Sequence, residues 1–252
     1  MISAIIITYN EESNIEECLK SISWVDEIVI VDSGSTDNTE QICKKYTKSF
    51  YFQEWLGYGP QKQFALGLAK NQWILSIDAD ERVTPELRND LENILKNEDT
   101  ISGYFIPREN YYLGKKIKYC GWYPDYTLRF AKRDKASFDN NLVHEKLLVD
   151  GSTAKLFTNM THYPFKSIAQ QLLKLNKYST ISADGMFNQN KSIPWIILFM
   201  KPIFTFFKIF ILRFGFLDGW RGLIISLAAS SSTYYKYLKL KERHLSKKER
   251  KN

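Results

Sequence analysis

Continuous apolar runs alternate with helical spacings along the first third of the chain. Residues 3–10, SAIIITYN, form an apolar run typical of a parallel strand that is covered on both faces. The next residues place Ile15, Leu19 and Ile22 at the spacing of one helix face. We predict one strand followed by one helix from this stretch.

The same pattern recurs twice more. Residues 27–31 predict a second strand, followed by a turn rich in Asp, Ser and Gly and by a helix that Ser35 or Asp37 caps. Residues 64–80 predict a further helix and then a third strand. Strands that alternate with helices across short turns indicate an α/β fold with a doubly wound, mostly parallel sheet. In such sheets, ligands bind beyond the carboxyl ends of the strands.

Polar loops follow all three predicted strands, at residues 8–11, 32–37 and 78–81. Because the strands are parallel, we expect these loops to face one crevice. The third loop, within LSIDADERV, holds Asp78 and Asp80, which would leave a strand on the same side. Hard carboxylate oxygens suit Mg²⁺ or Mn²⁺, whereas a simple turn needs only one Asp. Neither G-x-G-x-x-G nor G-x-x-x-x-G-K-[ST] occurs, which argues against a dinucleotide fold and a phosphate-loop ATPase.

Composition adds limits to this picture. The 252 residues are 44% hydrophobic, enough for a full core, and carry a net charge of +7 that is concentrated near the end of the chain. Three scattered cysteines argue against a disulfide framework or a zinc site and favour a reducing compartment. The first ten residues lack the charged region and cleavage site of a signal peptide, so we expect the N-terminal domain to stay in the cytoplasm.

After residue 100, short aromatic segments alternate with turn formers, which predicts a mixed or antiparallel extension of the sheet. Trp122, Tyr123 and Tyr126 there offer flat faces that suit either sugar rings or core packing. We therefore expect residues 1–190 to form one domain, with a parallel half at residues 1–100 and a mixed or antiparallel half at residues 101–190.

Residues 191–252 are expected to form a membrane-associated helical appendage. The apolar stretch 193–212 is long enough to span a membrane, yet it contains Lys201, Pro202 and Lys208, and two central lysines cost about 5 to 7 kcal/mol on insertion scales. The two lysines share one helical face with Thr205, which favours a helix lying in the membrane interface; a partly buried helical pair is the alternative. The basic tail favours the anionic cytoplasmic face of the inner membrane, with peripheral or monotopic attachment.

Three segments, residues 5–22, 31–42 and 74–83, together resemble the nucleotide-sugar half of glycosyltransferase family 2, whose fold is called GT-A. More narrowly, GWYPDYTLRF, VHEKL, HYPFKSIAQQLLKLNKYS and GFLDGWRGL resemble the bacterial group that adds a hexose, typically β-1,4-glucose, to the inner-core heptose of lipopolysaccharide. The resemblance implies that residues 1–190 form the catalytic domain, with a nucleotide-sugar half at residues 1–100 and an acceptor half at residues 101–190. It also implies a UDP-sugar donor, a lipid-linked glycan acceptor and a Mg²⁺ or Mn²⁺ cofactor. This cation would stabilise the diphosphate leaving group as a Lewis acid.

The resemblance also implies roles for individual residues. Asp80 would be the direct metal ligand and Asp78 would lie nearer the ribose or the metal shell, while His162 is either a metal ligand or a structural histidine. Phosphates would be contacted by Lys62, Arg129 and His162. The nucleoside would be held by Thr8, Tyr9, Glu11 and Asp32.

For the catalytic base, the resemblance points to Glu145, which follows His144, with Asp125 in reserve. One such base and one metal suffice for an inverting transfer without a covalent intermediate. Two alternatives remain open: a polyprenyl-linked or other glycolipid acceptor, and a non-catalytic membrane-surface protein that binds nucleotide sugars. We do not expect nucleic-acid binding, because the basic residues gather beside a hydrophobic segment.

Overall fold

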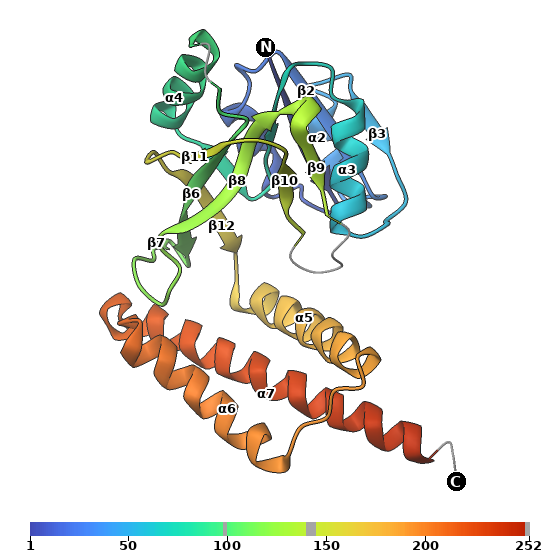
Figure 1. The fold of residues 1–252 in the computed structure, drawn as a ribbon, viewed down its shortest axis with the longest axis vertical. Helices are drawn as coiled ribbons and strands as arrows, with labels where there is room; N and C mark the ends of the chain where they lie inside the picture. The colour runs from blue at the N-terminus through green and yellow to red at the C-terminus, as the bar shows by residue number, and fades with distance from the viewer. Residues whose placement is uncertain (98–99, 140–144, 250–252) are drawn as a thin grey trace. The chain divides into compact units, whose positions relative to one another are not determined.

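The computed structural model describes residues 1–97, 100–139 and 145–249 (Figure 1). The chain packs into two compact units. Unit 1 comprises Met1–Glu109 and Pro124–Tyr163, and unit 2 comprises Asn110–Tyr123 and Pro164–Asn252. The predicted boundary at residue 190 follows a different criterion, the division of function, and stays a prediction.

Unit 1 contains the three predicted parallel strands, β1 (Ile2–Thr8), β2 (Glu27–Asp32) and β4 (Trp73–Ser76). A fourth parallel strand, β3 (Phe50–Phe52), was not predicted from the sequence. The four strands are parallel in the order β3-β2-β1-β4. The carboxyl ends of β1 and β2 lie side by side, because Thr8 pairs with Asp32.

The sheet continues beyond β4 with a different strand direction. β8 (Asp125–Lys132) runs antiparallel to both β4 and β6 (Gly103–Tyr112), and β12 (Met160–Phe165) runs antiparallel to β5 (Glu81–Val83). Two short strands, β7 (Lys115–Lys116) and β11 (Thr153–Lys155), also pair with β6. β9 (Ala136–Phe138) and β10 (Leu147–Val149) pair in a separate two-stranded sheet. The α/β fold class and its mixed extension are confirmed.

Helices cover both faces of the parallel strands, because the continuous apolar runs point side chains both ways. On one face, Ile2, Ala4 and Ile6 share a core with side chains of three helices. On the opposite face, Ile5 and Val29 pack with side chains of α3 (Tyr58–Leu68). The helices of the first face are α1 (Ile15–Ser21), α2 (Thr39–Cys43) and α4 (Pro85–Lys96).

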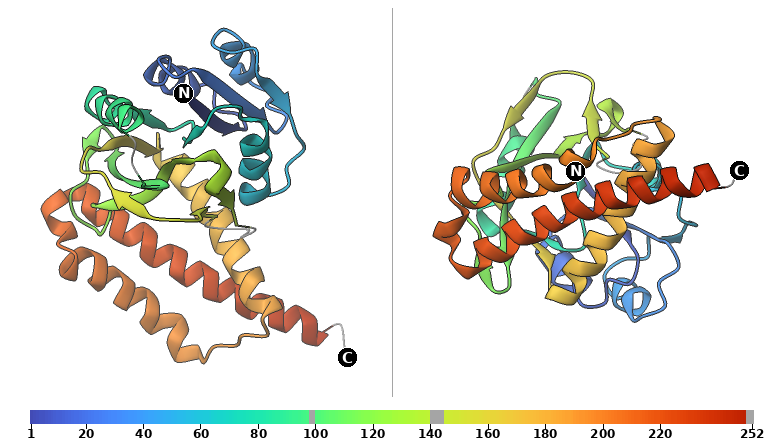
Figure 2. Two further views of the ribbon diagram at one scale, coloured as in Figure 1. Left: turned by 45° about the horizontal axis from the view of Figure 1, so that its top comes forward. Right: turned by 90° about the horizontal axis from the view of Figure 1, so that it is seen from below.

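Unit 2 is largely helical. It contains α5 (Ile168–Asn188), α6 (Trp195–Phe207) and the long α7 (Trp220–Glu249). A π-helical turn, Lys208–Leu212, and a 3₁₀ turn, Gly215–Asp218, connect α6 to α7. Helix α7 packs against both α5 and α6 (Figure 2).

The segment Asn110–Tyr123 supplies the other part of the unit 2 core. Tyr112, Ile117 and Cys120 pack with Ile225 of α7, and the ring of Trp122 lies edge-on to Tyr112 at 5.8 Å between centroids. Trp122 therefore packs in a core, which was one of its two expected roles. The backbone N–H groups of Lys118 and Tyr119 donate to the Asp218 carboxylate at 3.2 and 2.9 Å. These bonds tie the α6–α7 connection to this segment.

The first prediction follows from the close approach between the backbones of Gly222 and Gly215. A Cβ atom at this position would lie 1.8 Å from the carbonyl oxygen of Gly215. Gly222→Ala should therefore lower the free energy of unfolding by about 1 to 3 kcal/mol, the usual cost of overpacking. The matched control is Gly185→Ala in α5, where nothing lies within 4 Å and the change should stabilise by up to about 1 kcal/mol. Urea denaturation of both variants would measure this, and equal effects would contradict the close approach.

Candidate active site

The loops after β1 and β2 are joined by hydrogen bonds at the carboxyl edge of the sheet. The Asn10 N–H donates to Ser35 Oγ at 2.8 Å, and the Thr36 N–H donates to Asn10 Oδ1 at 2.8 Å. The Glu11 N–H donates to Thr39 Oγ1 at 2.8 Å. The two loops therefore form one surface, as expected for adjacent parallel strands.

The buried side chain of Asp32 holds both loops through hydrogen bonds. Its carboxylate accepts the backbone N–H groups of Gly34 and Ser35 at 2.8 and 2.7 Å, and the Thr8 hydroxyl at 2.8 Å. Gly34 has a φ of +90°, a conformation that glycine adopts without strain. Thr8 and Asp32 are both buried, whereas Tyr9 is 57% exposed. Of the residues expected to hold a nucleoside, Tyr9 thus presents its side chain to solvent and Asp32 supports the loop.

Acidic and basic side chains alternate along one connected chain of ion pairs in unit 1, which we call the ionic chain. It links the loop after β4 with α3, β5, β6 and β8. Its members, in order of contact, are Glu145, Lys62, Asp78, Arg129, Glu81, Arg108 and Asp125.

Lys62 and Arg129 both contact Asp78. The Lys62 Nζ lies 2.9 Å from Asp78 Oδ1 and 2.8 Å from Glu145 Oε1. Arg129 Nη2 donates to Asp78 Oδ2 and to Glu81 Oε1. The side chains of Lys62 and Arg129 are 7% and 5% exposed, so these contacts are made away from bulk water.

The other end of the ionic chain depends on Glu81. Glu81 is completely buried, and its Oε1 lies 3.1 Å from Arg108 Nη1. Arg108 in turn donates to Asp125 Oδ2 at 2.6 and 3.0 Å, since the two residues are paired between β6 and β8. The pairing between β6 and β8 skips Arg129, because Tyr104 pairs with Phe130 and Phe105 pairs with Leu128. This β-bulge, and not simple strand alternation, sets the direction of the Arg129 side chain. The register of the antiparallel strands thus builds this part of the site.

Burial and ion pairing shift the pKa values of Asp78 and Arg129 in opposite directions. Burial raises the pKa of the Asp78 carboxyl, but Arg129 and Lys62 outweigh it and hold that pKa well below its usual range. Burial lowers the pKa of the Arg129 guanidinium, yet Asp78 and Glu81 bring it above its usual value. Asp78 and Arg129 therefore stay ionised near neutral pH.

Asp78 and Asp80 have different surroundings, although only Ala79 separates them along the chain. The chain turns immediately after β4, so the two carboxylates do not follow the alternation of a strand. Asp78 faces the basic groups, whereas Asp80 Oδ2 lies 3.6 Å from the Nε2 of His162. His162 is held there because β12 pairs with β5, where it stands opposite Glu81.

The pair formed by Asp80 and His162 fits a divalent cation. A carboxylate oxygen and an imidazole nitrogen 3.6 Å apart can both reach one ion at bonds of about 2.0 to 2.2 Å, and both suit Mn²⁺. Within the described residues, no group of three or more His, Cys, Asp or Glu side chains gathers as a metal site. Further ligands would have to come from phosphate oxygens or water.

Two members of the ionic chain were not predicted from the sequence. Arg108 was not singled out, and Glu81 was included only within the range of the third loop, residues 78–81. For Arg108, the available signal was a short polar run, Arg108 to Asn110, between the apolar and aromatic residues of the strand GYFIPRENYY. Both candidate bases, Glu145 and Asp125, lie at opposite ends of the ionic chain. His144 lies outside the described residues.

Comparison with known proteins identifies the class. Residues 3–144 match the sequence family described as Glycosyl transferase family 2, so the chain is a sugar-transferring enzyme. The chain is 36% identical, over 96% of its length and 93% of the relative, to the lipopolysaccharide core biosynthesis glycosyltransferase LpsC of Rhizobium meliloti strain 1021. An uncharacterised glycosyltransferase of Rickettsia felis is 33% identical over 98% of the chain and 92% of that protein. The chain belongs to glycosyltransferase family 2.

Among solved structures, S. aureus TarS 1–349 in complex with UDP-GlcNAc covers 97% of this chain and 91% of its own, at 16% identity and a TM-score of 0.49. Glucosyl-3-phosphoglycerate synthase of Mycobacterium tuberculosis, in complex with Mg²⁺ and UDP, covers 68% of this chain and 74% of its own, at 19% identity and a TM-score of 0.46. The family assignment rests on the sequence matches. The prediction of a family 2 glycosyltransferase, and so of an enzyme, is confirmed.

The second prediction follows from the complete burial of Glu81. Glu81→Gln leaves Arg108 and Arg129 without their shared charge, and breaking a buried ion pair typically costs about 3 to 5 kcal/mol of unfolding free energy. Glu92→Gln is the matched control, because its pair with Arg88 is exposed and should contribute under about 1 kcal/mol. Urea denaturation at pH 7 compares them. A similar small loss in both would show that Glu81 does not support the two arginines.

Proposed function

We propose that the protein is an inverting hexosyltransferase that moves a sugar, expected to be glucose, from a UDP-sugar to the inner-core heptose of lipopolysaccharide. The supporting observation is the match to the R. meliloti lipopolysaccharide core glycosyltransferase, which extends over nearly the full length of both chains. The acceptor would be a lipid-linked glycan at the cytoplasmic face of the inner membrane. A polyprenyl-linked or other glycolipid acceptor is the alternative.

The donor would lie across the carboxyl edge of the parallel strands. Thr8, Tyr9, Glu11 and Asp32 are proposed to hold the nucleoside, with Tyr9 providing the exposed ring. Asp80 and His162 would hold Mg²⁺ or Mn²⁺, with Asp78 in the metal shell or near the ribose, and the bound cation would stabilise negative charge on the diphosphate. Lys62 and Arg129 supply fixed positive charge from the protein itself.

The acceptor step requires one carboxylate. Glu145 is proposed to take the proton from the acceptor hydroxyl as that oxygen attacks the anomeric carbon and UDP leaves from the opposite face, which inverts the configuration. The Lys62 ammonium keeps the Glu145 carboxylate oriented through its 2.8 Å contact. Asp125 is the second candidate, and Arg108 orients it in the same way. A binding protein without activity would need neither carboxylate.

The third prediction separates the two candidate bases. Glu145→Gln should lower turnover about 10²- to 10⁴-fold, because a general base contributes that much, while the affinity for the donor changes little. Asp125→Asn should lower turnover much less. UDP release and sugar transfer to heptose-bearing core oligosaccharide would be measured with a panel of UDP-sugars, beside calorimetric titration of UDP. Full loss in Asp125→Asn alone would move the assignment to Asp125.

The same assay tests the proposed function as a whole. Transfer from one UDP-sugar to the heptose acceptor, lost in Glu145→Gln, is the expected result. Transfer only to polyprenyl-linked acceptors would assign the alternative substrate. Donor binding without turnover on either acceptor would favour the non-catalytic protein.

The fourth prediction concerns the cation. EDTA should abolish transfer, and Mn²⁺ or Mg²⁺ should restore it in the unaltered protein. Asp80→Asn and His162→Gln should each weaken cation binding about 10- to 100-fold, since each removes or weakens one proposed ligand. Mn²⁺ binding in the presence of UDP can be followed by electron paramagnetic resonance. Unchanged Mn²⁺ affinity in both variants would place the cation elsewhere.

A further inference from the structure

Unit 2 exposes a stripe of large apolar side chains along α6 and its connection to α7. Phe199, Ile203, Phe207 and Ile211 recur every four residues and therefore line one helix face, and the stripe continues to Leu217 and Trp220. Each of these six side chains is 45% to 54% exposed. We call them the apolar surface. Exposed apolar surfaces are typical of sites that contact another protein or a membrane.

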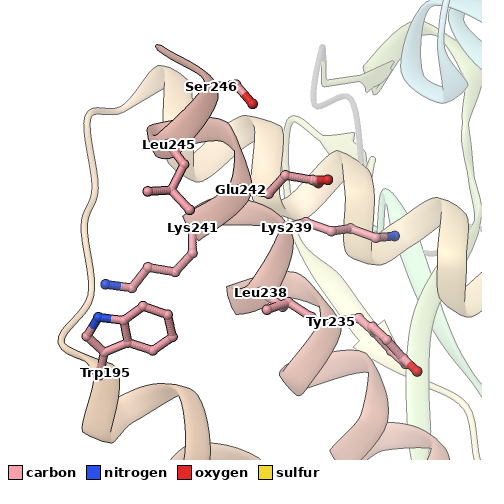
Figure 3. Close-up of a pocket in the computed structure, with 8 residues that line it drawn as sticks. All are labelled: Trp195, Tyr235, Leu238, Lys239, Lys241, Glu242, Leu245 and Ser246. Carbon is pink, nitrogen blue, oxygen red and sulfur yellow. The ribbon is translucent and has the colours of Figure 1, made fainter. Parts of the chain in front are cut away.

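A hollow between α6 and α7 adjoins the first turn of α6. It measures about 490 Å³, and Trp195, Tyr235, Leu238 and Leu245 line it (Figure 3). The Lys241 Nζ lies 4.9 Å from the centre of the Trp195 ring, on the same side of α7 (Figure 3). Aromatic rings beside lysines are typical of the level at which a membrane meets water.

Length and hydropathy alone leave two membrane arrangements open: a helix that spans the membrane and a helix that lies in the plane of one leaflet. The stretch Trp195–Leu212 has 18 residues and a mean hydropathy of 1.9, and only 11% of it is buried. At 1.5 Å per residue it is about 27 Å long, close to the thickness of the hydrocarbon core. Within the described residues, this is the one helical stretch that is long and apolar enough to cross a membrane.

Connectivity distinguishes the two arrangements. The residues that follow the apolar stretch are bound to the segment Asn110–Tyr123. The Cys120 N–H donates to the Arg213 carbonyl at 3.1 Å, and the Asp218 carboxylate accepts two backbone N–H groups of this segment. That segment, Asn110–Tyr123, continues directly into β6 and β8. A spanning α6 would have to draw it across the membrane together with Lys115, Lys116 and Lys118.

The other end of α6 is also restrained. Trp195, at the start of α6, contacts α7 through the Lys241 ammonium that lies over its ring. Helix α7 is in turn bound to α5, because Lys239 Nζ donates to Asn176 and Arg243 Nε donates to Asp184 at 2.8 Å. Helix α5 follows directly on β12. Both ends of the apolar stretch are thus tied to chain that continues into unit 1.

Charge indicates the chemistry of the partner. Lys201 and Lys208 of the α6 region are exposed, and Lys201 lies close enough to Lys236 of α7 to influence it. Burial lowers the pKa of the Lys236 ammonium, and repulsion from Lys201 lowers it further. A phosphate group would relieve this repulsion, and phosphates line the surface of an anionic phospholipid membrane.

We propose that α6, with its connection to α7, docks in the plane of one leaflet of an anionic phospholipid membrane. The apolar surface enters the acyl region, and Lys201, Lys236 and Lys241 contact lipid phosphates. This inference deepens the proposed function, whose lipid-linked acceptor would lie in that membrane. Vesicle binding is measured without substrate, so its failure is distinguishable from failure of the proposed transfer.

The fifth prediction is selective vesicle binding. The protein should sediment with vesicles of phosphatidylethanolamine and phosphatidylglycerol, more weakly with phosphatidylcholine alone, and less in high salt. Phe199→Asp combined with Phe207→Asp should weaken binding at least about tenfold, because charge is placed in the acyl region. Phe157→Asp is the matched control, since this side chain is 87% exposed on unit 1, and its binding should be unchanged.

Two results would overturn the docking proposal. One is a protein that stays in solution with every vesicle. In that case, sedimentation velocity without lipid would show whether a second copy covers the apolar surface, as a dimer that the double variant dissociates. The other is equal binding of the double variant and the unaltered protein.

Cysteine labelling tests the in-plane arrangement. Cys18, Cys43 and Cys120 are buried, so an impermeant maleimide should report only introduced cysteines. Ser192→Cys lies just before α6, and Lys115→Cys lies in the segment tied to its far end; both positions are exposed. In sealed inside-out membrane vesicles, labelling of both positions is expected. Labelling of one position alone would show that α6 spans the membrane.

Discussion

The buried carboxylate of Glu81 is the interaction on which the rest of unit 1 depends. It forms ion pairs with Arg108 and Arg129, and its Oε2 also accepts a hydrogen bond from the Asp78 N–H at 3.0 Å. A group with no access to water must be satisfied by its neighbours, so three strands and the loop after β4 are fixed relative to one another. Contacts within the protein therefore hold the charged groups of the site in place, and charged groups held in this way stabilise developing negative charge.

The parallel half of the sheet could be predicted because its information is local. Residues 4–7 and 28–31 are apolar without interruption, and this pattern is typical of a strand that is covered on both faces. The antiparallel half was predicted only in outline. Register between β6 and β8 depends on pairing across a loop, with a bulge at Tyr104 and Phe105, and no local pattern encodes it.

The site was predicted in part for the same reason. Loop residues that share a sheet edge, such as Thr8 and Asp32, follow from strand order. The ionic chain joins residues separated by as many as 83 positions, as in the contact between Lys62 and Glu145, so one sequence shows its members without their pairing. The different surroundings of Asp78 and Asp80 arise because the strand ends before both residues.

The tie between Asp218 and the backbone of Lys118 and Tyr119 has a consequence for synthesis of the chain. The two sites are about 100 residues apart, and at about 5 to 20 residues per second the ribosome needs about 5 to 20 seconds to make the intervening chain. Throughout this interval Tyr112, Ile117 and Cys120 lack Ile225, their later core partner. The nascent protein thus carries an incomplete core until its last helix emerges, a period in which chaperones or the membrane itself can shield it.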